Sequence, residues 1–200
     1  VLYSDFSAQE KNITEALKMC KYYFPAYHLP GTILTYVGPL DGYGDIMVTG
    51  ELLAIGLHHH LGKQYSMYAS DLVAPIYPQY ITQQFEPGYI EINCMKNIVN
   101  DMYPEENEKT NTGNWQENVS MINKMIENGK RLYLLSCLLP HKEEHLLIGY
   151  TKEQMGDCLK NERSIWNFFT QNNLLQSVDR SLMKNYISEG PKTPELGEAA

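Results

Sequence analysis

The chain has 200 residues, of which 43% are hydrophobic, and a formal net charge of −8. This length and apolar content are sufficient for one domain with a hydrophobic core, and they argue against a disordered chain. The negative charge argues against nucleic-acid binding, because phosphate contacts require a basic face. No run of 18 apolar residues is present, so no segment is expected to span a membrane.

The four cysteines are widely spaced and include no C-x-x-C pair; they are Cys20, Cys94, Cys137 and Cys158. A zinc ribbon and a dithiol redox motif are therefore not indicated. Free cysteine behaves as a small buried hydrophobe, so we expect these residues to be reduced and to lie in the core. The 15 tyrosines suit either partly wetted grooves or ordinary half-buried packing.

The N-terminal segment predicts a helix followed by strands. Apolar residues at three- and four-residue spacing indicate a helix over residues 7–24, which Pro25 ends. Two β-rich segments, 31–38 and 45–49, flank the turn sequence PLDGYG. We expect these two segments to pair as a hairpin.

Residues 51–62 (ELLAIGLHHHLG) are long enough for a helix, but Gly56 and the preceding hairpin favour a third strand. On such a strand His58 and His60 would share one face. An H-x-H pair is a known half of a zinc site, but no fixed spacing supplies a third ligand. We therefore expect these histidines to be hydrogen-bonded or solvated, and we assign no metal site.

The central part of the chain alternates irregular and helical patterns. The Tyr- and Pro-rich residues 66–86 are expected to be irregular and to cover the sheet edge or an open face. A helix is predicted at 88–103, an exposed loop at 104–113 and a long helix from Asn114 to the stop at Pro140. The inner side of the long helix is expected to comprise Val119, Ile122, Ile126, Tyr133, Leu134 and Cys137.

Gly129 lies in the middle of this long helix, where it costs about 1 kcal/mol relative to alanine. A close approach of another element at this position would explain it. Further along, Thr151 and Gln154 form a capping box that predicts a helix continuing to Phe169. A last helix is expected over 177–188.

Glu162 falls within the apolar stripe of the helix that begins after Thr151. The apolar members of this stripe are Met155, Cys158, Leu159, Ile165, Trp166 and Phe169. A buried unpaired carboxylate costs several kcal/mol, so Glu162 is expected to be paired, hydrogen-bonded or protonated. It is either an acid in a cleft or one half of a buried pair, and the candidate cations are Lys130, Arg131 and Arg163.

The sequence HKEEH at 141–145 differs from a zincin motif. H-E-x-x-H requires Glu directly after the first His, where it serves as general base, and Lys142 occupies that position. Pro140 precedes the segment, so we expect a solvated connector. No nucleophile elbow, P-loop or dinucleotide-binding glycine motif is present.

Six segments of the chain carry a family resemblance, in this order: IGLHHHLG (55–62), YPQYITQQFEPGYI (77–90), MIENGKRLYLLSCLLP (125–140), IGYTKEQMGDCLKNERSIWNFF (148–169), LLQSVD (174–179) and YISEGPKTPEL (186–196). These segments resemble the GldB family of gliding-motility lipoproteins from Bacteroidetes. The run GYT-x-E-Q…NE-x-x-x-W, which ends at Trp166, is the most specific of these. The family usually has Asp at the position of His58, so no role is transferred to that residue, and it continues past Ala200 into a final helix.

The resemblance implies a lipoprotein that is tethered by a lipidated Cys upstream of this chain and faces the periplasm, with the outer membrane as its setting. It also implies a distant similarity to zincin peptidases. In that comparison residues 88–103 correspond to the metal-binding helix of a zincin. The segment MIENGK corresponds to a later Glu-Gly helix. Residues 88–103 contain no His, so the resemblance implies a metal-less scaffold, or pseudoenzyme.

Together these observations predict an α+β fold in which a small antiparallel or mixed sheet packs on four or five helices. A single domain is expected over 1–200, with an N-terminal helix within 1–29 and a loose tail at 190–200. The expected function is a non-catalytic binding or assembly component of the cell envelope with protein partners, no cofactor and a Tyr-lined contact groove. The alternative is a hydrolase that uses the histidines as metal ligands or Glu162 as a carboxylate. Candidate contact or structural-network residues are His58, His60, Lys130, Glu162 and Trp166.

Overall fold

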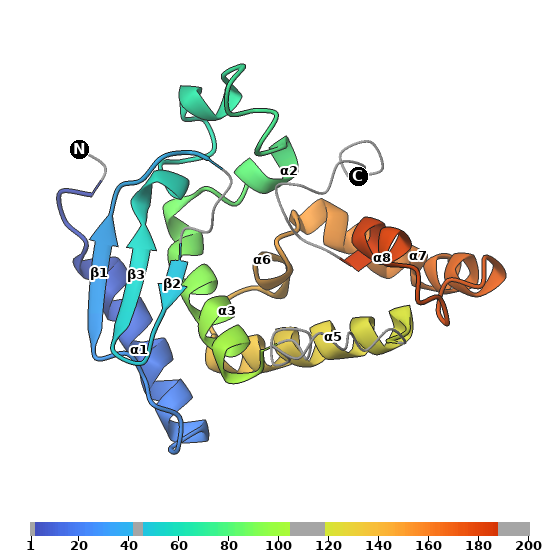
Figure 1. Ribbon diagram of the computed structural model, residues 1–200, viewed down its shortest axis with the longest axis horizontal. Coiled ribbons are helices and arrows are strands. Elements are labelled where there is room, and N and C mark those ends of the chain that lie inside the picture. The colour runs from blue at the N-terminus through green and yellow to red at the C-terminus, as the bar shows by residue number, and fades with distance from the viewer. Residues whose placement is uncertain (1–2, 42–45, 105–118, 188–200) are drawn as a thin grey trace, which may run out of the picture.

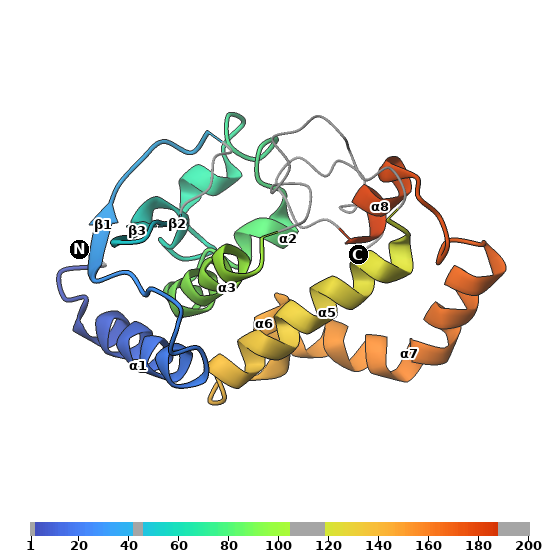
Figure 2. The same ribbon diagram turned by 60° about the horizontal axis from the view of Figure 1, so that its bottom comes forward.

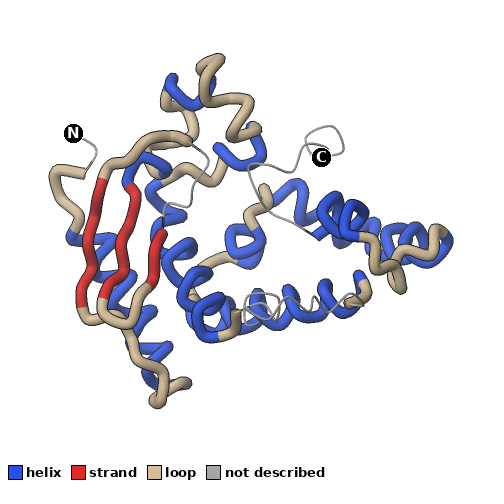
Figure 3. Tube along the Cα trace, in the orientation of Figure 1, coloured by secondary structure: helices blue, strands red, loops and turns tan. Residues whose placement is uncertain are grey.

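The computed structural model describes residues 3–41, 46–104 and 119–187. Helices and one small three-stranded mixed sheet make up this part of the chain (Figures 1 and 3). The predicted α+β class is therefore confirmed. The expected tail at 190–200 and most of the expected loop at 104–113 lie outside the described residues.

Helix α1 (Ser7–Tyr23) confirms the first predicted helix. Its apolar stripe buries Ile13, Ala16 and Cys20 against the sheet and the central helix. The helix ends where the backbone N–H of Phe24 donates to the carbonyl of Cys20 over 2.8 Å, immediately before the helix-breaking Pro25.

The sheet contains β1 (Thr32–Tyr36), β2 (Ile46–Val48) and β3 (Leu52–Gly56) in the order β1-β3-β2. The expected hairpin of the first two strands is wrong, because β3 lies between them. β1 pairs with β3 in parallel, and β2 pairs with β3 in antiparallel fashion. The tight turn joins β2 to β3 instead, and in it the Thr49 N–H donates to the Leu52 carbonyl over 2.8 Å.

The third strand stops earlier than expected. After Gly56 the chain turns into a 3-10 helix, Leu57–His59. The expectation that His58 and His60 share a strand face is therefore wrong, since both follow the end of β3. The three histidines turn inward together at the end of the sheet, where each is buried.

The Tyr- and Pro-rich segment is irregular, as predicted, with a 3-10 helix at Ser66–Ala69 and one short helix, α2 (Gln79–Thr82). A further 3-10 turn, Pro87–Tyr89, leads into α3 (Ile90–Met102). Figure 1 shows this segment beyond the end of the strands, whereas the sequence suggested a position along the sheet edge or over an open face.

Helix α3 is the centre of the fold and confirms the helix predicted at 88–103. Its buried residues contribute to two hydrophobic clusters, one shared with α1 and the sheet and one shared with α1 and α5 (Met121–Leu138). The buried side chains of α3 are Ile90, Glu91, Ile92, Cys94, Met95, Ile98 and Val99.

Helix α5 differs from its prediction in its start and in its inner face. It begins at Met121, after Val119 and Ser120, and the expected start at Asn114 lies outside the described residues. Its buried residues are Met121, Leu135 and Leu138.

Two residues that were predicted to lie on the inner side of α5 are exposed. Tyr133, which was expected to face the core, is 73% exposed, and Ile126 is also exposed. Gly129 has no neighbouring atom within 4 Å of where a Cβ would stand, so the expected close approach there is wrong.

The C-terminal helices are α6 (Glu144–Ile148), α7 (Lys152–Gln171) and α8 (Arg180–Ile187). The predicted capping box is present at the start of α7. The Gln154 N–H donates to Thr151 Oγ1 over 3.1 Å, and the Thr151 N–H donates to Gln154 Oε1 over 2.9 Å. Figure 2 shows α7 extending away from the sheet, on the far side of α5.

Candidate functional site

The histidine cluster, His58 to His60, lies at the end of β3, where it joins the sheet to the Tyr-rich segment. Nδ1 of His58 accepts a hydrogen bond from the Gly38 N–H over 3.1 Å, and its carbonyl accepts one from the Tyr68 hydroxyl over 2.6 Å. The His60 carbonyl accepts a hydrogen bond from the hydroxyl of Tyr3. These bonds attach three other parts of the chain, at Tyr3, Gly38 and Tyr68, to the histidine cluster.

His59 completes this arrangement through its aromatic contacts. Its Nε2 lies 2.9 Å from the Tyr77 hydroxyl, and its ring stacks on Phe85 with the centroids 4.8 Å apart. Within residues 3–41, 46–104 and 119–187, no three His, Cys, Asp or Glu side chains are grouped so that they could hold a metal ion. The contacts of the cluster are those of a packed structural element.

A pocket of about 360 Å³ opens beside His58. Its lining residues are Val37, Gly38, Leu40, His58, Leu61, Tyr65, Met67, Leu72 and Val73. Most of these are aliphatic, and only one is a tyrosine. Tyr68 and Tyr77 of the Tyr-rich segment do not line it and are buried in a hydrophobic cluster with Val73 and Phe85.

A second polar group, which we name the Glu91 cluster, consists of Glu91, His141 and Lys142. Glu91 is 3% exposed, and its carboxylate lies 2.8 Å from Lys142 Nζ and 3.1 Å from His141 Nε2. The expectation of a solvated connector at 141–145 is therefore wrong for Lys142, whose side chain is largely covered. The connector after α5 is attached to α3 by this ion pair.

The sequence contained a signal for Glu91 that the prediction did not use. Glu91 lies four residues before Met95 and seven before Ile98, so it falls on the apolar stripe of α3. A carboxylate on a buried stripe must be paired, hydrogen-bonded or protonated. The same reasoning was applied to Glu162 on α7, but the buried carboxylate is Glu91 on α3.

Glu162 is exposed, so the expectation that it is buried is wrong. Among the ion pairs and hydrogen bonds of the described residues, none involves Glu162 or Arg163. Lys130, proposed as its cation, pairs on the surface with Glu127 over 2.6 Å. Arg131 donates to the carbonyl of Tyr103 over 2.9 Å. The structure therefore does not bring Glu162 and Lys130 together.

The apolar stripe of α7 is present but lies at the surface. Leu159 is 63% exposed, Trp166 is 43% exposed, and Ile165 is also exposed. Only Phe169 is buried, in a small cluster with Met121 and Leu174. We call the exposed stripe, comprising Leu159, Glu162, Ile165 and Trp166, the α7 face.

The described residues form an α+β fold with a buried group of histidines and aromatic side chains, a buried ion pair and an exposed apolar helix face. The sequence model of the family described as gliding motility protein GldB matches this chain over residues 1–200. The chain belongs to the GldB family, a family of gliding-motility lipoproteins associated with the cell envelope. No curated protein and no solved structure matches it, so the similarity to zincins stays a prediction. None of the described helices is long and apolar enough to cross a membrane.

Proposed function

We propose that this chain is a non-catalytic binding component of the cell envelope that contacts a protein partner through the α7 face. The observation that carries the proposal is the exposure of Leu159, Ile165 and Trp166 on one stripe of a 20-residue helix. Amphipathic helices normally bury such a stripe. Apolar side chains that gather on an exposed surface indicate an interaction site, and tryptophan is enriched at the energetic centres of interfaces.

Family membership supports the setting of this function. We infer that the chain is tethered by a lipid on a cysteine upstream of Val1 and faces the periplasm, where it takes part in assembling or maintaining an envelope complex. A tether of this kind confines the domain to the membrane surface, so that a modest contact surface is sufficient for a stable association.

The hydrolase alternative receives less support. It rested on Glu162 as a carboxylate and on His58 and His60 as metal ligands. Glu162 is exposed, and the two histidines are buried at the end of the sheet. An enzyme site requires converging polar groups in one pocket, and the pocket beside His58 is lined mainly by aliphatic side chains.

The proposal is tested by placing a charge on the α7 face. Leu159→Asp introduces a carboxylate at the exposed stripe, and Ser164→Asp introduces the same charge on the opposite side of α7. The full lipoprotein is extracted from its native envelope in a mild detergent and its apparent size is measured. We expect the wild type and Ser164→Asp to run as a complex and Leu159→Asp to run alone. If Leu159→Asp stays in the complex, the α7 face is not the contact surface.

A further inference from the structure

Strand β1 is an edge strand. In the described part of the chain it pairs only with β3, so its other side faces away from the sheet (Figures 1 and 3). The Thr32 N–H donates toward β3, to the carbonyl of Glu51 over 3.1 Å. Alternate residues of a strand direct their backbone groups to opposite edges, so the N–H groups of Ile33 and Thr35 face outward. An outward row of this kind is a template for a further strand.

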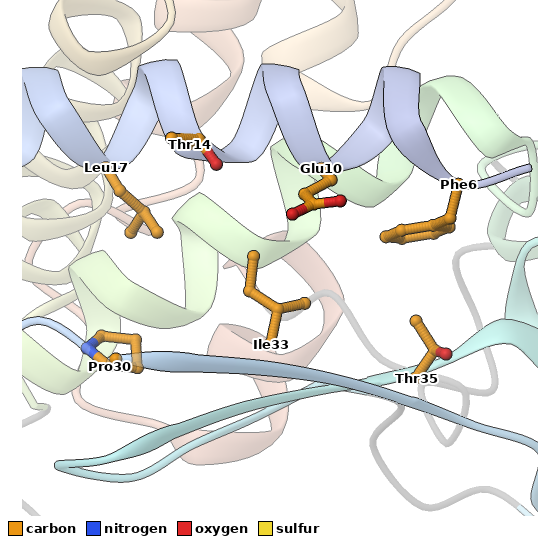
Figure 4. A pocket seen from close by; sticks show the side chains of 8 residues that line it. Phe6, Glu10, Thr14, Leu17, Pro30, Ile33 and Thr35 are labelled. Atoms are coloured by element: carbon orange, nitrogen blue, oxygen red, sulfur yellow. The ribbon is translucent and has the colours of Figure 1, made fainter.

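A groove of about 430 Å³ runs between this edge and α1. We call it the α1–β1 groove, and it is lined by Phe6, Glu10, Thr14, Leu17, Pro30, Gly31, Ile33 and Thr35. Figure 4 shows the side chains of Glu10 and Leu17 directed from the helix toward the strand, and those of Ile33 and Thr35 directed from the strand toward the helix. The groove therefore has a strand edge on one side and a helix flank on the other.

The spacing of side chains along α1 fits an extended chain. Positions four residues apart, such as Phe6, Glu10 and Thr14, are separated by about 6 Å along a helix. Alternate side chains of a strand are separated by about 6.6 Å. A strand added to β1 would therefore place successive inward side chains near Phe6, near Glu10 and near Thr14 or Leu17.

The chemistry of the groove specifies these side chains. Phe6 and Leu17 are apolar, and Glu10 lies between them with its carboxylate in the gap (Figure 4). Glu10 has no ion pair with a described residue, whereas Glu15 on the same helix pairs with Lys18 over 2.7 Å. A basic side chain would complement Glu10, and two apolar side chains would contact Phe6 and Leu17.

We propose that the α1–β1 groove binds an extended segment of a partner protein, which adds to β1 as a fourth strand and directs an apolar–basic–apolar set of side chains inward. A second copy of β1 fits poorly, because its sequence TILTY contains no basic residue. This site is independent of the α7 face, which lies at the opposite end of the molecule (Figure 1).

The test uses two seven-residue peptides, acetyl-Thr-Leu-Thr-Lys-Thr-Leu-Thr-amide and the same peptide with Glu in place of Lys. Binding is followed by NMR, together with hydrogen exchange of the Ile33 and Thr35 amides. We expect the Lys peptide to bind about fivefold more tightly than the Glu peptide, as a partly exposed charge pair allows. We also expect it to slow the exchange of both amides. Glu10→Gln should remove the preference, and the matched control Glu15→Gln should keep it.

A second pair of variants isolates the backbone contribution. Thr35→Pro removes an outward N–H, which an edge strand tolerates, and Thr35→Val retains it. We expect circular dichroism to show both variants folded, and only Thr35→Pro to lose peptide binding. The proposal is overturned by the absence of binding at millimolar peptide, or by binding that leaves the exchange of the two amides unchanged. It is also overturned by a dimer of the free protein in which these amides are already protected.

Discussion

The Nζ atom of Lys142 lies 2.8 Å from Oε2 of Glu91, a residue that is only 3% exposed. This contact joins the first turn of α3 to the connector that follows α5. Nε2 of His141, from the same connector, lies 3.1 Å from the other carboxylate oxygen of Glu91. Both contacts attach the connector to α3.

Removing Lys142 is expected to destabilise the fold. Lys142→Ala leaves a buried carboxylate with one partly exposed partner, and breaking a buried pair in this way costs about 3 kcal/mol. The free energy of unfolding in urea measures this cost. Lys152→Ala is the control, because Lys152 and Glu143 form an exposed pair that contributes little. Equal effects of the two substitutions would show that Glu91 does not depend on Lys142.

Replacing Glu162 is expected to have no effect on stability, in contrast to Phe169. Glu162→Ala changes an exposed side chain without an ion pair in the described structure, so the melting temperature should not move. Phe169→Ala removes the buried ring that packs with Met121 and Leu174, at a cost of about 3 kcal/mol. Thermal unfolding followed by circular dichroism compares the two variants. A large loss in Glu162→Ala would mean that α7 buries its stripe in solution.

Tyr27 is expected to make stability depend on alkaline pH. Burial, together with the 2.5 Å hydrogen bond from its hydroxyl to Asp101, raises the pKa of Tyr27 above the ordinary 10.0. Below pH 10 the folded and unfolded chains both keep the proton. Above it, the unfolded chain releases the proton first, so the stability contributed by Tyr27 is lost as pH rises.

Urea unfolding of Tyr27→Phe at several pH values checks this contribution. The variant should be less stable than the wild type by about 1 kcal/mol at pH 7, the usual net value of one hydrogen bond. The difference between the two proteins should shrink between pH 10 and 12. A difference that stays constant across this range would show that the pKa of the Tyr27 hydroxyl is not raised in the folded protein.

Local signals in the sequence predicted their elements correctly. The capping box of Thr151 and Gln154, the stop at Pro140 and the stripes of α1 and α3 each depend on neighbours within one or two turns, and each is present in the structure. Strand order was not predictable in the same way. The insertion of β3 between β1 and β2 depends on long-range pairing, which strand patterns alone do not encode.

In the candidate site, too, local features were predictable and long-range contacts were not. The apolar stripe of α7 was predicted correctly, but periodicity does not indicate whether a stripe packs against the chain's own core or against a partner. For Glu91, the signal on α3 was present, while its cation Lys142 lies 51 residues further along the chain. Only the folded structure brings the two together. His58 and His60 were expected on one face of a strand over residues 51–62, but β3 ends at Gly56 and the chain continues as a 3-10 helix.

The most direct test of the central claim is site-specific photo-crosslinking from the α7 face. A photoreactive phenylalanine analogue replaces Leu159 in the full lipoprotein in its native envelope, and the same analogue at Ser164, on the opposite side of α7, is the control. We expect a discrete crosslinked protein from position 159, absent at position 164 and lost when Trp166→Ala is added. Identical crosslinks from both positions, or none from position 159, would contradict a binding role for this face.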